Sequence, residues 1–332
     1  MGIKDLNQLL KRICGSTHIS HVPMCNFDGQ KIAIDAALYV CVFKLRGVLN
    51  YIPSIVEFLT MLRENGIHPF FVFDGVAPDE KNDERTARSE KRAVQRDRIQ
   101  KLKRELELYK QTGVLSDLLK GIDFRTRRLA PNKVSFATIQ EHINKLESQL
   151  VNVTADDFET MKTLLNIFGV GYTTAPGEGE FFCAALNRHG LVSAVMTADT
   201  DVFPCLAPTV INKIDSTYFQ VVSLCDILRE MKMTEKQFIE LCIMCGTDFN
   251  KNIPRIGIMG SYELMLKHKS IDNLPPEINT APLNYVRVRE LFASTDNKPT
   301  IDVPYCRPIN YEGLNKFVSD ISMIKKRIDK RI

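Results

Sequence analysis

The stretch Lys31–Leu38, KIAIDAAL, places the short apolar run Ile-Ala-Ile directly before a carboxylate, Asp35. Two later stretches repeat this arrangement, PFFVFDGV at 69–76 and LVSAVMTADTDVF at 191–203. All three runs are rich in Val, Ile or Phe and too short for an amphipathic helix, which is typical of buried parallel strands. The sequence therefore predicts three strands, each followed by acidic residues.

Helical patterns separate these predicted strands. Apolar residues recur at helical spacing in 51–67 and 156–170, and each segment carries a glycine near its end. Further neighbouring strands are expected from TVINKI at 209–214 and YFQVVS at 218–223. Strands that alternate with helices predict an α/β fold with a mostly parallel central sheet flanked by helices.

The composition is that of an ordinary globular protein. Among 332 residues, 44% are hydrophobic and 25% charged, the net charge is only +4, and no apolar run reaches the roughly 18 residues of a membrane span. Nine scattered cysteines favour reduced thiols inside the cell over a disulfide framework. Cys242 and Cys245 are expected to be buried thiols, with half of a zinc site as the weaker alternative.

Acidic residues gather where a functional crevice is expected, beyond the carboxyl ends of parallel strands. A single aspartate at a strand-to-helix turn is commonly a helix cap, but here several strand ends share the feature. TAPGEGEFFCAAL at 174–186 adds two carboxylates at a helix start, where flanking Gly177 and Gly179 leave room for the backbone. Asp199 and Asp201 are expected to point together from an extended segment. Seven carboxylates are candidates for one site: Asp35, Asp74, Glu178, Glu180, Asp199, Asp201 and Asp248.

Such a cluster predicts bound cations. Two carboxylates about 5 Å apart repel by roughly 3 kcal/mol at an effective dielectric near 20, so the groups must protonate or bind positive ions. A site built from oxygen ligands alone selects hard ions, Mg²⁺ or Mn²⁺. Two such ions serve phosphoryl transfer. The residues therefore point to hydrolysis of phosphodiesters.

A basic segment follows the second predicted strand. KNDERTARSEKRAVQRDRIQKLKR at 81–104 holds ten Lys or Arg against four Asp or Glu. Lys81, Arg85, Arg88 and Arg92 fall at i, i+4, i+7 and i+11, which is one stripe of a helix. A solvated charged face is the alternative, but a one-sided stripe close to Asp74 favours contact with phosphate. A basic loop is expected near 120–133.

The ordered motifs resemble the flap endonuclease family, the structure-specific 5′ nucleases that include the Rad2-type enzymes. The match covers most of the chain and runs through MGIKDLNQLL, IAIDA, FVFDG, the K…RSEKR run, APGEGE, TADTD, LCIMCGTDF and IGIMGSYELMLKHKSI. The resemblance implies a PIN-like nuclease core with a helical arch and a helix-two-turn-helix. It divides the chain into 1–75 and 154–250 for the core, 76–153 for the arch and 251–332 for the remainder.

The resemblance also implies roles for individual residues. The seven carboxylates would hold or surround two Mg²⁺ ions, with Asp35, Asp74, Glu178 and Asp201 taking part in catalysis. Lys81 and Arg88 would be arch cations that polarise the scissile phosphate, and the amino group of Gly2 would lie near the site. Residues 253–261 would grip duplex DNA through main-chain amides and a monovalent cation, usually K⁺. The DNA contacts are expected at Gly2, Arg85, Arg92, Gly257 and Gly260.

Some features depart from the usual family pattern. Arg255-Ile256-Gly257 stands where the family usually has Gly-Ile-Gly, and Cys41 stands where an aromatic residue is common. The chain shows no Gln-x-x-Leu-x-x-Phe-Phe tail for a sliding clamp, which is similar to short relatives from large DNA viruses. The expected partner is branched double-stranded DNA with a 5′ single-stranded flap, without a membrane. A monomer is expected in the nucleus, or at a cytoplasmic replication site if the protein is viral.

Three functions are compatible with these residues. The first is a Mg²⁺-dependent 5′ flap endonuclease with 5′–3′ exonuclease activity, in replication, repair or recombination. The second keeps the fold but acts on four-way junctions or mainly as an exonuclease. The third is a non-catalytic DNA-binding scaffold, which is disfavoured because a scaffold gains nothing from seven mutually repelling carboxylates.

Overall fold

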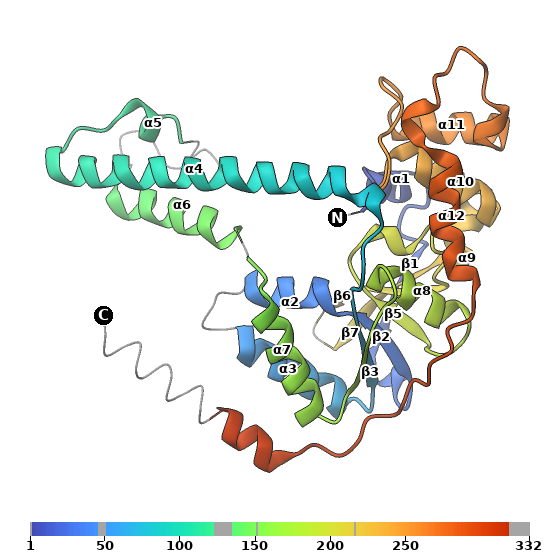
Figure 1. Cartoon of the computed structure of the whole chain (residues 1–332), viewed down its shortest axis with the longest axis horizontal. Coiled ribbons are helices and arrows are strands. Elements are labelled where there is room, and N and C mark those ends of the chain that lie inside the picture. The colour runs from blue at the N-terminus through green and yellow to red at the C-terminus, as the bar shows by residue number, and fades with distance from the viewer. Residues whose placement is uncertain (1, 46–50, 123–134, 151, 216, 319–332) are drawn as a thin grey trace.

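The computed structural model describes residues 2–45, 51–122, 135–150, 152–215 and 217–318 (Figure 1). Within these residues seven strands form one mixed sheet in the order β1-β7-β6-β5-β2-β3-β4. Their bounds are β1 (Ile19–Pro23), β2 (Lys31–Asp35), β3 (His68–Phe73), β4 (Gly171–Thr174), β5 (Ala194–Met196), β6 (Thr209–Asp215) and β7 (Tyr218–Ser223).

The predicted parallel strands are confirmed. β2 pairs in parallel with β3 and β5, and the parallel set continues to β4 on one side and β6 on the other. The segments 209–214 and 218–223 are neighbouring strands as expected, but β6 and β7 pair antiparallel, and β1 adds to β7 in the same way. The fold is therefore α/β with a mostly parallel sheet and an antiparallel edge.

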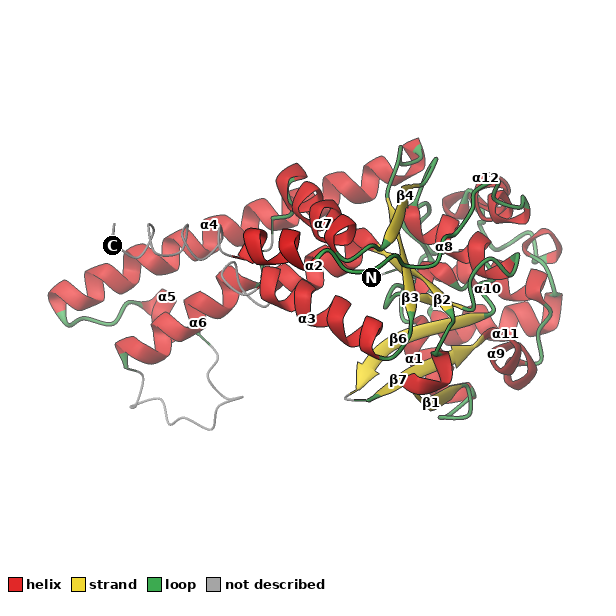
Figure 2. Ribbon diagram, turned by 90° about the horizontal axis from the view of Figure 1, so that it is seen from below, coloured by secondary structure: helices red, strands yellow, loops and turns green. Residues whose placement is uncertain are grey.

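Helices cover both faces of the sheet (Figures 1 and 2). In β2, Ile32 and Ile34 contribute to one hydrophobic cluster with the helices α2, α3 and α7, whereas Ala33 contributes to a second cluster with α1 and α8 to α12. This alternation follows from the two-residue period of a strand. The helices that contribute to these two clusters are α1 (Leu6–Ile13), α2 (Ala36–Leu45), α3 (Tyr51–Glu64), α7 (Ala155–Ile167), α8 (Gly179–Arg188), α9 (Leu224–Met231), α10 (Glu235–Cys245), α11 (Ile258–His268) and α12 (Tyr285–Ala293).

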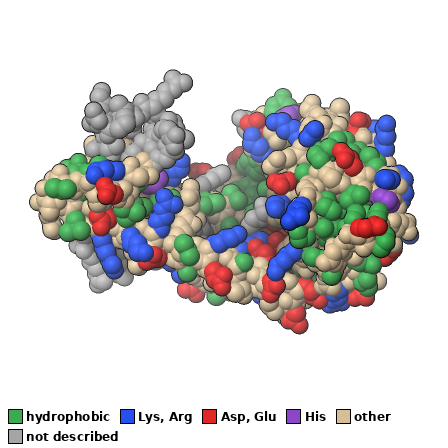
Figure 3. Space-filling view, turned by 90° about the horizontal axis from the view of Figure 1, so that it is seen from above, with side chains coloured by type: hydrophobic (Ala, Val, Ile, Leu, Met, Phe, Trp, Pro, Cys, Tyr) green, Lys and Arg blue, Asp and Glu red, His purple; other side chains and the backbone are tan. Residues whose placement is uncertain are grey.

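The basic segment forms a helix as predicted, and this helix extends far from the core. α4 (Asn82–Thr112) packs with the short α5 (Asp117–Lys120) and with α6 (Phe136–Ser148). These helices share a small hydrophobic cluster of their own, which includes Ile99, Leu106 and Ile139. Figure 3 shows this lobe separated from the rounded core by a hollow, with Lys and Arg side chains on both. Most of the basic loop expected at 120–133 lies outside the described residues.

Two local predictions have different outcomes. Cys242 and Cys245 are free thiols buried in α10, which confirms that interpretation. The extended segment predicted for Asp199 and Asp201 is wrong, because Thr200–Val202 forms a 3₁₀ turn. The turn arises because the Asp199 carboxylate accepts a hydrogen bond from the backbone N–H of Asp201 at 3.2 Å. Among the described residues, no helix combines the length and the apolar character required to cross a bilayer.

Candidate active site

Acidic side chains from three strand ends meet at one edge of the sheet. Asp35 is the last residue of β2, Asp74 follows β3, and Asp199 and Asp201 follow β5. Asp35 is buried, and this burial raises its pKa to about 7, with the charges of Asp74 and Asp199 adding to the effect. The parallel order of the strands therefore places carboxylates from distant parts of the sequence within electrostatic reach of one another.

Helix α8 brings two more carboxylates to the same edge. Glu178 is the residue directly before α8, Glu180 lies in its first turn, and both are buried. Burial raises the pKa of Glu180, and the nearby charges of Asp201 and Asp199 raise it further. The partial positive charge of a helix N-terminus favours such groups, but it offsets only a fraction of their mutual repulsion.

Asp201 is the most deeply buried of these groups. Its exposed fraction is 0%, and both carboxylate oxygens are without a hydrogen-bond partner among the described residues. Burial raises its pKa, followed by the charges of Asp199 and Asp248. A buried carboxylate without donors is costly unless a cation or a proton neutralises it. The oxygens of Asp201, surrounded by further carboxylates, therefore fit a hard divalent cation.

Two cations at the start of α4 contact this cluster. The Lys81 ammonium donates a hydrogen bond to Glu178 and lies 3.8 Å from the nearer oxygen of Asp248. Burial opposes the charge on Lys81, but Glu180, Glu178 and Asp248 together raise its pKa. In the described part of the chain, no three His, Cys, Asp or Glu side chains are arranged as a ready-made ion site. Because Lys81 contacts Glu178 and Asp248, its positive charge neutralises part of the negative charge of the cluster.

Arg88 joins the long helix α4 to the loop after α10. Its Nη2 atom donates to Asp248 at 2.9 Å, and its Nε atom forms an ion pair with Glu84, one turn earlier in α4. Partial burial opposes the charge, whereas Asp248 and Glu84 raise the pKa of Arg88. The structure therefore brings Lys81, Arg88 and all seven predicted carboxylates into one connected electrostatic cluster.

Two glycines allow the backbone to approach the cluster. Gly2 has a φ of 87°, and a Cβ at this position would lie 2.2 Å from Oδ1 of Asp199. The backbone N–H of Gly179 donates to Asp74 at 2.8 Å. A Cβ at Gly177 would meet only a carbonyl oxygen at 3.8 Å, but the carbonyl oxygen of Gly177 itself accepts a hydrogen bond from the backbone N–H of Gly75 at 2.8 Å. Both glycines of the PGEGE stretch thus bring their backbone close to the end of β3, where Gly179 contacts Asp74 itself and Gly177 contacts the next residue, Gly75.

Family models cover two segments of the chain that contribute to this cluster. The XPG N-terminal domain matches residues 1–95, and the XPG I-region matches residues 169–248. Together they contain all seven carboxylates, together with Lys81 and Arg88. The first segment supplies β2, β3 and the start of α4, and the second supplies α8 and the loop after α10.

Curated relatives match almost the whole chain. Flap endonuclease 1 of Aedes aegypti is 30% identical over 344 residues, covering 96% of this chain and 82% of the relative. The chain belongs to the flap endonuclease family, also called XPG/Rad2. Another relative, the probable RAD2-like endonuclease 369L of Invertebrate iridescent virus 6, is 28% identical and covers 91% of this chain and 82% of its own length. Nucleases of this family use divalent metal ions.

Solved structures of family members share the fold. The catalytic core of Rad2 in complex with a DNA substrate superimposes with a TM-score of 0.67 at 18% identity, covering 96% of this chain and 95% of Rad2. Flap endonuclease-1 from Methanococcus jannaschii gives a TM-score of 0.59 at 22% identity and covers 94% of each chain. Human GEN1 in complex with Holliday junction DNA gives 0.58 at 16% identity, covering 97% of this chain and 74% of GEN1.

The remaining positions expected to contact DNA lie outside the acidic cluster. Arg85 and Arg92 are exposed on α4. Gly257 directly precedes α11 and Gly260 lies in its first turn, where both line a shallow hollow. The predicted stripe, which begins at Lys81 directly before α4, thus separates into two cations that contact carboxylates and two that face solvent.

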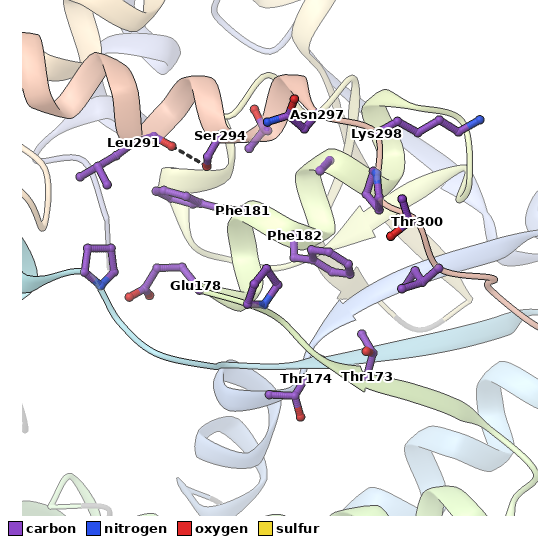
Figure 4. Close-up of a pocket in the computed structure, with 17 residues that line it drawn as sticks. Thr173, Thr174, Glu178, Phe181, Phe182, Leu291, Ser294, Asn297, Lys298 and Thr300 are labelled. Carbon is purple, nitrogen blue, oxygen red and sulfur yellow. Dashed lines mark hydrogen bonds between the residues drawn. The ribbon is translucent and has the colours of Figure 1, made fainter.

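Two features near the site were not predicted from the sequence. Glu84 pairs with Arg88, and its spacing of four residues within the basic segment was the available signal. A cavity of about 570 Å³ adjoins Glu178 and is lined by Phe181, Phe182 and Lys298, among others (Figure 4). No local pattern could have revealed this cavity, because α8 and residues 291–301 meet only in the folded chain.

Proposed function

We propose that this protein is a structure-specific 5′ flap endonuclease, with accompanying 5′–3′ exonuclease activity, that hydrolyses phosphodiesters in branched DNA. The observation that supports it most strongly is Asp201, a buried carboxylate without hydrogen-bond donors inside an acidic cluster, in a chain of the flap endonuclease family. Such a group is costly in a scaffold and useful in a site that binds cations and phosphate.

Two divalent ions, Mg²⁺ with Mn²⁺ as a substitute, are part of this proposal. The residues that would hold or surround them are Asp35, Asp74, Glu178, Glu180, Asp199, Asp201 and Asp248. The bound ions would supply Lewis-acid activation of water and stabilise charge on the leaving oxygen. The K⁺ expected at residues 253–261 is not included, because carbonyl oxygens in that turn already accept hydrogen bonds.

Lys81 and Arg88 are the proposed catalytic cations. Each contacts a carboxylate of the cluster, so each becomes available when divalent ions neutralise Glu178 and Asp248. Their side chains would then turn to the scissile phosphate, where a positive charge stabilises the transition state. The guanidinium of Arg88 can bind two phosphate oxygens at once, whereas Lys81 acts as a point charge.

The proposed partner is branched DNA with a 5′ flap, bound by a monomer through its sugar-phosphate backbone. Gly2 would lie beside the junction, and exposed Arg85 and Arg92 would contact phosphates along the arch. Gly257 and Gly260 would bring backbone amides at the start of α11 to the duplex. Residues 1–75 and 154–250 would form the core, 76–153 the arch and 251–332 the duplex-binding remainder. The activity fits a nucleus or a cytoplasmic viral replication site.

A substrate panel tests this proposal. The protein is incubated with Mg²⁺ and labelled 5′ flaps, nicks, blunt duplexes and four-way junctions, and cleavage near the flap junction is expected to be fastest. Equal or faster cutting of four-way junctions would replace the proposal with a resolvase, an alternative compatible with the fold shared with GEN1. Absence of cleavage on every substrate, with binding retained, would point to a scaffold.

A further inference from the structure

The loop between α10 and α11 contains an asparagine whose side chain closes a turn. The Nδ2 atom of Asn252 donates to the carbonyl oxygen of Ile253 at 3.3 Å and to that of Ile256 at 3.4 Å. The Ile253 carbonyl also accepts from the backbone N–H of Ile256 at 3.2 Å. The side-chain amide therefore lies where two main-chain carbonyls converge, directly before the start of α11.

This arrangement does not fit a bound monovalent cation. A K⁺ ion held by protein backbone is surrounded by carbonyl oxygens that replace its water shell. In this turn the converging carbonyls face the amide hydrogens of Asn252, which carry partial positive charge and would repel a cation. The amide satisfies the same oxygens that an ion would otherwise require.

Arg255 is the second unusual residue of the turn. It has a φ of 68°, a left-handed conformation that costs a residue with a side chain roughly 1 kcal/mol relative to glycine. The side chain is exposed and lines the shallow hollow at the start of α11 together with Gly257, Gly260 and Lys267. The strained backbone therefore carries a permanent positive charge at the surface expected to meet the duplex.

We propose that Asn252 and Arg255 together take the place of a monovalent cation at this turn. The amide of Asn252 holds the two carbonyls, and the guanidinium of Arg255 supplies the positive charge that meets a DNA phosphate. The grip on duplex DNA is therefore independent of K⁺. This inference rests on the proposed flap nuclease function for its substrate, and Asn252 and Arg255 act as positioning and binding residues.

The experiment compares salts of equal ionic strength. Binding of a fluorescent 5′-flap duplex is measured by anisotropy with Ca²⁺ in KCl, NaCl or tetramethylammonium chloride. The natural chain is expected to show the same Kd within about twofold in all three salts. The double variant N252S/R255G opens the carbonyls and removes the competing charge, so it is expected to bind about tenfold more tightly in KCl than in tetramethylammonium chloride.

A second readout does not require DNA. The melting temperature of each variant is measured in the same three salts, and only N252S/R255G is expected to be stabilised specifically by K⁺. Asn273→Ser is the matched control, because the exposed Asn273 also donates its amide to a backbone carbonyl, that of His268 at 3.2 Å. This control should remain indifferent to the cation in both measurements.

Tighter binding of the natural chain in KCl, by about fivefold or more, would overturn the inference. So would a folded N252S/R255G variant that responds identically to every cation in both measurements. These outcomes are distinct from a failure of the proposed function, which would appear as absence of flap cleavage by the natural chain in Mg²⁺ whatever the monovalent salt.

Discussion

The Nη2 atom of Arg88 in α4 lies 2.9 Å from the Oδ2 atom of Asp248, in the loop that follows α10. This contact joins the first part of the long helix α4 to a carboxylate of the acidic cluster, and Lys81 reinforces it at 3.8 Å from the same oxygen. Lys81 and Arg88 therefore already lie among the carboxylates before any substrate is present. Ion binding and cation release are expected to be coupled, because both compete for the same oxygens.

Arg88→Ala is expected to reduce the single-turnover rate of flap cleavage by about 10²- to 10³-fold, while affinity in Ca²⁺ changes little. The reason is that Arg88 would stabilise charge that develops only in the transition state. Arg92→Ala is the comparison on the same helix, because Arg92 is exposed and would contact only backbone phosphate, so this variant is expected to weaken binding and leave the single-turnover rate nearly unchanged. If Arg88→Ala lowered affinity and left the rate unchanged, Arg88 would be a simple backbone contact.

Asp201→Asn is expected to abolish cleavage and to retain flap binding in Ca²⁺. It should also raise the melting temperature of the metal-free protein at pH 8, because it removes a buried charge without hydrogen-bond donors. Thermal unfolding in EDTA measures this second effect, and circular dichroism confirms the fold. Loss of cleavage together with a lower melting temperature would mean that Asp201 has a mainly structural role.

The metal-free protein should become less stable as the pH rises from 5 to 8. The folded pKa of Asp35 is about 7, above the value near 3.9 that is ordinary for an unfolded chain. Its contribution to stability is therefore fully present below about pH 4 and is lost as the pH rises through about 7. The pKa values of Glu180 and Asp201 shift in the same direction.

Mg²⁺ should counter this loss, because it neutralises the same carboxylates. The increase in melting temperature on adding Mg²⁺ is expected to be larger at pH 8 than at pH 6, and Asp35→Asn should reduce the difference. Equal Mg²⁺ effects at both pH values would show that the buried carboxylates do not govern ion binding.

Gly2→Ala should lower flap cleavage much more than Gly15→Ala. Both glycines have a positive φ, but a Cβ at Gly2 would lie 2.2 Å from Asp199, whereas a Cβ at Gly15 meets nothing within 4 Å. The comparison separates backbone strain from displacement of the acidic cluster. Cleavage rates and apparent Mg²⁺ affinity are measured for both variants, and equal losses would exclude a special role for Gly2 at the site.

Much of the site was predictable because its carboxylates follow short apolar strands. Parallel strands end at a common edge, so Asp35 and Asp74 had to approach one another once β2 and β3 paired. Periodicity also predicted α4, which carries Arg88 and begins directly after Lys81. The antiparallel edge formed by β1 and β7 was not predicted, because strand order depends on long-range pairing rather than on local pattern.

The contacts of individual polar groups could not be predicted from the sequence. The 3₁₀ turn at Thr200 depends on a hydrogen bond between a side chain and the backbone, and the contact between Arg88 and Asp248 joins residues 160 positions apart. The role of Asn252 depends on carbonyls that converge only in the folded loop. None of these contacts has a periodic signal in the chain.

The sequence by itself determined the alternation of the main parallel strands with helices, the acidic residues at strand ends and the basic segment between them. Hydrophobic periodicity and turn residues act locally, so they can be recognised in a single amino-acid sequence. Only the tertiary structure decided which cation pairs with which carboxylate, which oxygens are left without donors and which turn is closed by its own amide. Those outcomes depend on distances between groups far apart in sequence. Burial then determines the strength of the electrostatic interaction between the charged groups.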